Sequence, residues 1–182
     1  MARWRRPDKP GNWRVVNIPT EELFTAPDPA RADGVIRASM PLALSGSLVE
    51  GLVLRFEGGQ IVEVQADSGA DIIRGYIATD PGASRLGEVA LVDATSPIRQ
   101  SGVIFLNTLL DENATCHIAF GDGIRTAVRG FDAANPPSDE EIGVNVSKTH
   151  IDFMVGSRDV TVTGVTASGA RHTLLRDDLW QI

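Results

Sequence analysis

The chain has 182 residues, and its 42% hydrophobic content is enough to build the core of one compact domain. The formal charge of −7 argues against a nucleic-acid partner, which needs a basic surface. The single cysteine, Cys116, excludes an internal disulfide, and no apolar run reaches the roughly 20 residues that span a bilayer. With no signal peptide evident at the start, we expect a cytoplasmic protein with no membrane partner.

The first elements in chain order are a lead-in and a short strand. Residues 1–12 are polar and contain Pro7, Pro10 and Gly11, which predicts a flexible lead-in before one domain over 13–182. Residues 13–18 are rich in β-branched side chains and end at Pro19. This pattern predicts a strand that runs into a turn carrying two carboxylates.

A hairpin is the clearest element in the next part of the chain. Residues 34–44 favour a strand, and residues 47–56 and 61–66 alternate in hydrophobicity around a Gly58–Gly59 turn. Helical spacing of apolar residues follows over 68–77, with Ser68 as the expected cap. Asp80 is expected to cap a second short helix that includes Leu86.

The second half contains further strands around one long loop. Strands are predicted over 88–92, 115–120 and 149–155, and a closing hairpin over 160–165 and 170–175. Residues 102–110 fit either a helix or a strand, and 121–143 reads as a loop with a short helix at 138–142. The pattern predicts a strand-rich α+β domain with two or three short helices. Its mixed, largely antiparallel sheet could close into a barrel.

His150 and Asp152 are the pair that the residues themselves indicate as a metal half-site. Side chains two positions apart in a strand point to the same side, so an imidazole and a carboxylate would face one way together. A hydrogen-bonded structural pair is the alternative interpretation. Glu88 opens an otherwise apolar strand, where a buried carboxylate needs a partner. His172, in the last hairpin, is expected to be an exposed strand residue.

Four ordered motifs resemble those of the M29 metalloaminopeptidases. They are residues 17–27, which include Pro-Thr-Glu-Glu; residues 86–92, which include Gly-Glu-Val-Ala; residues 107–114 followed by His117; and residues 149–157, which include His-Ile-Asp-Phe-Met. The resemblance runs from about Asn17 to the C-terminus in the family's order and nearly its spacing. It therefore covers almost the whole chain.

The resemblance implies a dinuclear metal site that removes N-terminal residues from peptides, built on zinc, or on cobalt or manganese. It places ligands at Glu22, with Glu21 as the alternative, and at Glu88, shared between the metals. The remaining ligands fall on His117, His150 and Asp152. Nitrogen and oxygen donors suit such metals. A carboxylate left free of metal, Glu21 or Glu22, could move a proton in catalysis. The family also forms dimers, so a homodimer is expected.

Two departures from the family pattern bear on activity. The family's chains are more than twice as long, with an N-terminal domain that helps to enclose the active site, and this chain resembles the catalytic half alone. Ile124 stands where the family has a tyrosine, and the neighbouring Arg125 is a candidate to stabilise an oxyanion in its place. Because the loop around Ile124 is changed, we expect a hydrolase of a non-standard small amide or amino-acid conjugate. An ordinary aminopeptidase and a non-catalytic metal-binding relative are the alternatives.

Overall fold

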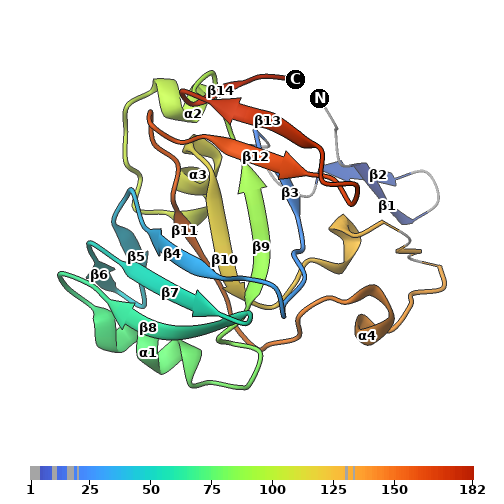
Figure 1. The fold of residues 1–182 in the computed structure, drawn as a ribbon, viewed down its shortest axis with the longest axis horizontal. Coiled ribbons are helices and arrows are strands. Elements are labelled where there is room, and N and C mark those ends of the chain that lie inside the picture. The colour runs from blue at the N-terminus through green and yellow to red at the C-terminus, as the bar shows by residue number, and fades with distance from the viewer. Residues whose placement is uncertain (1–4, 10–11, 16–18, 20, 130, 133) are drawn as a thin grey trace.

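A four-stranded antiparallel sheet, in the order β11-β10-β9-β3, forms the centre of the molecule (Figure 1). The computed structural model describes residues 5–9, 12–15, 19, 21–129, 131–132 and 134–182. The strands of the central sheet are β3 (Leu23–Thr25), β9 (Leu86–Leu91), β10 (His117–Gly121) and β11 (His150–Met154). Segments far apart in the sequence therefore lie side by side in this sheet.

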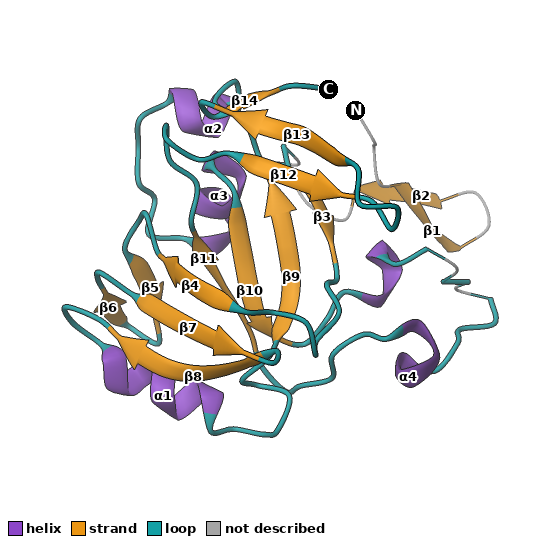
Figure 2. Ribbon diagram, viewed as in Figure 1, coloured by secondary structure: helices purple, strands orange, loops and turns teal. Residues whose placement is uncertain are grey.

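Two further sheets flank the central one (Figure 2). The first has the order β4-β7-β8, with bounds β4 (Gly34–Arg37), β7 (Val53–Glu57) and β8 (Gln60–Gln65). The second contains β12 (Val162–Val165), β13 (Arg171–Arg176) and β14 (Leu179–Trp180). Two hairpins are separate: β1 (Arg5–Lys9) with β2 (Asn12–Val15), and β5 (Leu42–Leu44) with β6 (Ser47–Val49).

The helices of the described residues are short. They are α1 (Ala70–Ile77), α2 (Pro97–Gln100), α3 (Thr108–Asp111) and α4 (Asp139–Ile142), with 3-10 turns η1 (Glu112–Ala114) and η2 (Arg125–Ala127). Helix α1 lies along β8, and its Ile73 is fully buried. None of these helices is long and apolar enough to cross a membrane.

The hydrophobic core lies on one face of the central sheet. Ile118 and Phe120 of β10 and Phe153 of β11 pack there with Leu54 and Phe56 of β7. The rings of Phe120 and Phe153 are tilted, with centroids 6.3 Å apart. Since alternate strand residues point to opposite faces, His117 and Ala119 of β10 must project from the other face. That second face carries the polar residues described below.

The expected α+β class with largely antiparallel sheets is confirmed, and every strand pairing among the described residues is antiparallel. The described strands form open sheets and no closed barrel. The hairpin at Gly58–Gly59 is confirmed as β7–β8, and the closing hairpin as β12–β13. The arm expected over 47–56 is not one strand, because it divides into β6, which pairs with β5, and β7. The short helix predicted at 138–142 in the long loop is confirmed as α4, and Ser138 is its N-cap.

Several local expectations need correction. Residues 34–44 form two strands, because Pro41 cannot donate a ladder hydrogen bond where the chain turns. Asp80 accepts hydrogen bonds from the N–H groups of Gly82 and Ala83, but it closes a turn and no helix follows. Gly69, in the left-handed conformation, precedes α1 in place of the expected Ser68 cap. Residues 102–107 are a loop that leads into α3.

The N-terminal expectations fall partly outside the described residues. Residues 5–9, expected to belong to a lead-in, form β1 and pair with β2. The predicted strand over 13–18 is described as far as Val15, within β2, and residues 16–18 lie outside the described residues.

Candidate metal centre

The strand register places four of the candidate ligands on one face of the central sheet. Glu88 of β9 and Asp152 of β11 both lie opposite Ala119 of β10. Directly opposed residues in antiparallel strands point to the same side, as do residues two positions apart. His117 and His150, two positions before Ala119 and Asp152, therefore share that face. Sequence spacing alone predicted only the pairing of His150 with Asp152.

His117 lies between two glutamates. Its Nε2 is 3.1 Å from Glu22 Oε2 and 3.8 Å from Glu88 Oε1. Glu22, just before β3, is buried, as are Glu88 and His117. These three residues can each direct a ligand atom at one ion. Three such groups, out of contact with bulk water, match the donor set of a divalent metal site.

His150 forms a second group of the same kind. Its Nε2 lies 3.2 Å from Glu88 Oε2 and 3.2 Å from Asp152 Oδ1. Glu88, His150 and Asp152 can also direct one atom each at a common ion. Glu88 thus turns one carboxylate oxygen to each histidine. Glu88 is therefore a member of both candidate ligand groups.

Glu112, in η1, is a fourth acidic residue at the centre. It is buried, and its carboxylate, the His117 imidazole and the Asp152 carboxylate offer ligand atoms within 4.8 Å of one another. Glu112 was not among the predicted site residues, although its position in the chain carries a signal. It lies in the third M29-like motif, five positions before His117, within a run of three polar residues, and all three are buried.

The neighbouring carboxylates raise the pKa values of the two histidines. Burial alone would lower the pKa of His117, but hydrogen bonds to Glu22 and Glu88 raise it to about 10. For His150, hydrogen bonds to Asp152 and Glu88 likewise outweigh burial and raise the pKa to about 11. Burial would raise the pKa of Glu88, and the two histidines hold it below its usual value. Without metal, protons on the imidazoles supply the positive charge that the carboxylates need.

Backbone carbonyls orient both imidazoles. His150 Nδ1–H donates to the carbonyl oxygen of Asp122 at 2.7 Å, and His117 Nδ1–H faces the carbonyl oxygen of Thr115 at 3.3 Å. In both rings the Nε2 atom is thereby turned toward the carboxylates, which is the usual support of a metal-binding histidine. Gly87 leaves room for the Asp122 carbonyl that accepts from His150, because a Cβ at residue 87 would lie 2.2 Å from that carbonyl oxygen.

Asn113 connects two of the segments that build the centre. The Glu21 N–H donates to Asn113 Oδ1 at 2.8 Å, and Asn113 Nδ2 donates to the Leu109 carbonyl at 3.1 Å. The Ser96 hydroxyl donates to the Asn113 carbonyl at 2.6 Å. Asn113 is fully buried. It therefore fixes the turn that carries Glu22 against the helical segment that carries Glu112.

The remaining predicted site residues lie outside the cluster. Of the two adjacent glutamates, Glu22 joins the ligand groups, and Glu21 joins none of those found among the described residues. Arg125 forms a two-pronged ion pair with Asp139 of α4, so its guanidinium is already occupied at the edge of the site. Its expected role toward an oxyanion stays a prediction. His172 is exposed on β13, as expected.

The donor set fits divalent metal ions well. Four buried carboxylates, from Glu22, Glu88, Glu112 and Asp152, surround two imidazoles that present Nε2. Burying so many acidic groups is costly unless cations compensate their charge. Oxygen and neutral imidazole nitrogen donors favour zinc, manganese or cobalt over softer ions. The residues present therefore fit the binding of divalent metal ions.

Known proteins resemble this chain over almost its whole length. Residues 3–180 match the family described as thermophilic metalloprotease (M29). Aminopeptidase T of Thermus aquaticus is 50% identical over 179 residues, covering 97% of this chain and 43% of that protein. Aminopeptidase AmpS of Bacillus subtilis is 42% identical, covering 93% of this chain and 42% of that protein.

A solved structure extends the agreement to the fold. Wild-type AmpT from Thermus thermophilus superposes with a TM-score of 0.87 at 46% sequence identity. The match covers 98% of this chain and 44% of that one. The chain thus spans less than half the length of the relatives it matches.

Proposed function

Because the chain belongs to the M29 family of metallopeptidases, we propose that it carries the metal centre of an ordinary aminopeptidase that removes N-terminal residues from peptides. The observation that supports this proposal most directly is Glu88, whose two oxygens face two separate groups of metal-ligand side chains. The related proteins named aminopeptidase favour a peptide substrate over the non-standard amide expected from the changed loop.

In this proposal Glu22, Glu88 and His117 would hold one ion, and Glu88, His150 and Asp152 would hold the other. When bound, two divalent ions lower the pKa of a water molecule and polarise the substrate carbonyl. The protein's part is to hold both Nε2 atoms in place through the carbonyls of Asp122 and Thr115. Zinc is the first candidate metal, with cobalt and manganese as alternatives.

Glu112 is our candidate for the group that moves the proton to the leaving amine. It is buried beside His117 and Asp152, and our ligand assignment gives it a catalytic role although it could also direct a ligand atom at an ion. A carboxylate in such a site can take a proton from water and deliver it to the amine nitrogen. This role replaces the one expected for Glu21 or Glu22.

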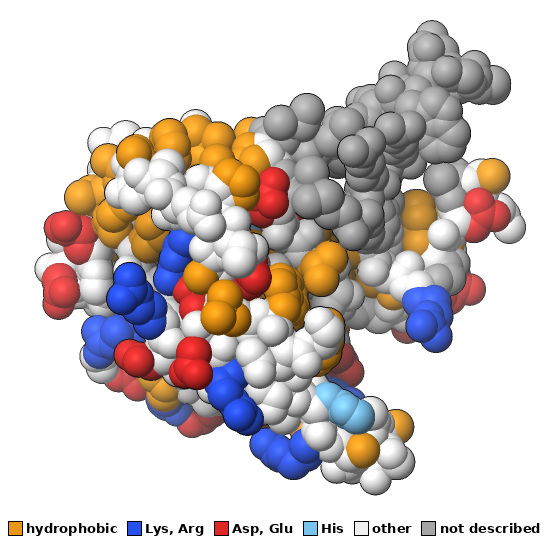
Figure 3. Space-filling model, turned by 90° about the horizontal axis from the view of Figure 1, so that it is seen from above, with side chains coloured by type: hydrophobic (Ala, Val, Ile, Leu, Met, Phe, Trp, Pro, Cys, Tyr) orange, Lys and Arg blue, Asp and Glu red, His pale blue; other side chains and the backbone are white. Residues whose placement is uncertain are grey.

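Association with a second copy is part of the proposal. Among the described residues, Val103, Ile104, Leu106 and Leu109 expose about half of their surface. Figure 3 shows apolar side chains gathered on part of the face seen there. Monomers rarely leave a contiguous apolar patch uncovered. We expect a homodimer by light scattering, and a strictly monomeric protein would contradict this part.

The experiment for the activity uses unblocked aminoacyl anilides. The metal-loaded protein should release the chromogenic amine from leucine anilide, and the N-acetylated anilide should resist. A chelator should abolish the activity and added zinc or cobalt should restore it. The His150→Ala variant should lose activity far beyond its loss of stability. A metal-loaded protein that cleaves small amides but neither peptides nor anilides would overturn the peptidase proposal and favour the non-standard substrate.

A further inference from the structure

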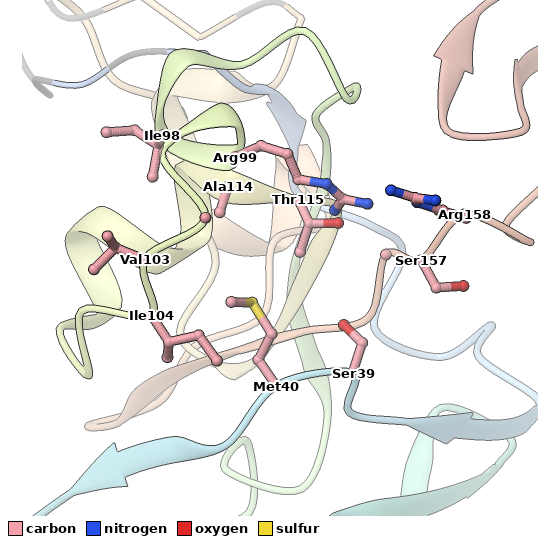
Figure 4. A pocket seen from close by; sticks show the side chains of 12 residues that line it. Ser39, Met40, Ile98, Arg99, Val103, Ile104, Ala114, Thr115, Ser157 and Arg158 are labelled. Atoms are coloured by element: carbon pink, nitrogen blue, oxygen red, sulfur yellow. The ribbon is translucent and has the colours of Figure 1, made fainter.

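A cavity lies next to the segment that leads into β10. It encloses about 370 Å³ and is lined by residues 39–40, parts of 98–104, residues 114–115 and residues 156–158 (Figure 4). None of Glu22, Glu88, His117, His150 and Asp152 lines it. Its volume falls within the range of small-molecule pockets. The proposed aminopeptidase activity gives this cavity no role.

One end of the cavity is polar and cationic. Figure 4 shows the guanidinium groups of Arg99 and Arg158 pointing toward each other, with the Thr115 hydroxyl beside Arg99. The two arginines are the charged residues of the lining. Thr115 is 1% exposed, and its Oγ1 has no hydrogen-bond partner within the described part of the chain. A buried hydroxyl without a partner is costly, so a ligand that reached this atom would gain a hydrogen bond there.

The other side of the cavity is aliphatic. Figure 4 shows Ile98, Val103 and Ile104 opposite the arginines, with Met40 between them and Ser39. Val103 and Ile104 also belong to the exposed apolar loop before α3. A ligand that filled the cavity would therefore cover apolar surface at one end and meet hydrogen-bond donors at the other.

The charges behind the cavity set how strongly an anion can be held. Arg99 is ion-paired with Asp178, whose side chain is 2% exposed. Arg158 is exposed and makes no hydrogen bond or close ion pair with another described residue. The charges of Arg158 and Asp93 both interact electrostatically with Asp178 without a hydrogen bond, so four charges lie behind the cavity: Arg99, Arg158, Asp93 and Asp178. The four charges nearly balance, so binding must depend on directed N–H groups and apolar contact, and we expect it to be weak.

We propose that this cavity binds a small aliphatic carboxylic acid. The carboxylate accepts hydrogen bonds from Arg158, Arg99 and the Thr115 hydroxyl, and the aliphatic part packs on Ile98 and Ile104. The guanidinium fork matches a carboxylate in shape and charge. The natural ligand is a free apolar amino acid or a branched acyl acid, which share this chemistry. The site stands independently of the proposed peptidase activity.

The test is an NMR titration of the intact protein with 4-methylpentanoate, leucine and the neutral 4-methylpentanamide. We expect saturable shifts at the amides of Thr115 and Ser157 with 4-methylpentanoate, at millimolar affinity. The amide should bind at least tenfold more weakly, because it lacks the charge that strengthens hydrogen bonds to arginine. If leucine binds as tightly as the acid, the ligand is a free amino acid; if leucine binds more weakly, it is an acyl acid.

Arg158→Gln is the decisive variant, because an exposed arginine without close partners can be replaced without unfolding the protein. This substitution should weaken the binding of 4-methylpentanoate at least tenfold. Arg171→Gln, which removes an exposed arginine from β13, is the matched control and should leave binding unchanged. The absence of saturable shifts in the unmodified protein would overturn the proposal. Equal affinity in the Arg158→Gln variant, or equal affinity for the neutral amide, would also overturn it.

Discussion

Asn113 provides the sharpest test of how the metal centre is held together. The Asn113→Leu substitution keeps the branched shape and the number of side-chain heavy atoms, and it removes the acceptor of the Glu21 N–H and the donor to the Leu109 carbonyl. Leaving a buried polar group without its partner costs roughly 1–3 kcal/mol. Part of this cost should appear as lost stability, and part as freedom of the turn that carries Glu22. Loss of a group that orients a metal ligand typically weakens metal binding about 10–100-fold.

The assay separates these two effects. Zinc affinity is measured by competition with a chromogenic chelator, and the Co²⁺ absorption spectrum reports the geometry of the ligands. Ile73→Val, at the buried core residue of α1, is the control, since it should cost about 0.5–1.5 kcal/mol of stability without touching the centre. We expect Asn113→Leu to weaken zinc binding and alter the spectrum, while Ile73→Val leaves both unchanged. Equal zinc affinities in the two variants would refute the role assigned to Asn113.

Three further predictions follow from the geometry. Gly87→Ala should displace the Asp122 carbonyl and weaken metal binding about tenfold or more, and an unchanged affinity by the same competition would contradict the close approach. Glu112→Gln should keep its metal, by elemental analysis, and lose about 10²–10⁴-fold in activity, whereas loss of metal would make Glu112 a ligand. In metal-free protein, the pKa values of His117 and His150 are raised to about 10 and about 11 by folding, from about 6.5 in the unfolded chain. Their protonation therefore stabilises the folded state fully below about pH 6.5, and this stabilisation is lost as the pH rises through the folded-state pKa values. The urea midpoint should therefore fall between about pH 7 and pH 10, and a midpoint that rose would contradict the assignment.

The sequence predicted most of the strands, because they alternate or are bounded by glycine and proline. The β7–β8 and β12–β13 hairpins follow from such local signals. Local signals do not report which strands pair at long range. The neighbourhood of β3 and β9, more than 60 positions apart, came only from the structure. Asp80 illustrates a local signal that misled. It accepts backbone hydrogen bonds as a helix cap would, but it closes a turn, which a further hydrogen bond from the Lys148 N–H holds in place.

Some residues of the candidate site could likewise be predicted from local spacing, and others depend on long-range strand pairing. Spacing along one strand was enough for His150 and Asp152, because side chains two positions apart share a face. Spacing could not bring Glu22, Glu88 and His117 to that pair, since their meeting depends on the register of three strands. The M29 resemblance supplied these residues in advance. Glu112 was missed because a glutamate at the end of an apolar segment usually indicates a solvated helix end, and nothing local indicates that it is buried.

The number of metal ions bound per chain tests the central claim most directly. Metal-free protein is titrated with zinc by calorimetry, and the loaded protein is checked by elemental analysis. We predict about two ions for each chain, and a loss of tight binding in the Glu88→Gln variant, because Glu88 faces both groups of ligands. A chain that binds no zinc, cobalt or manganese at saturating concentrations, or a Glu88→Gln variant that binds two ions unchanged, would contradict the account.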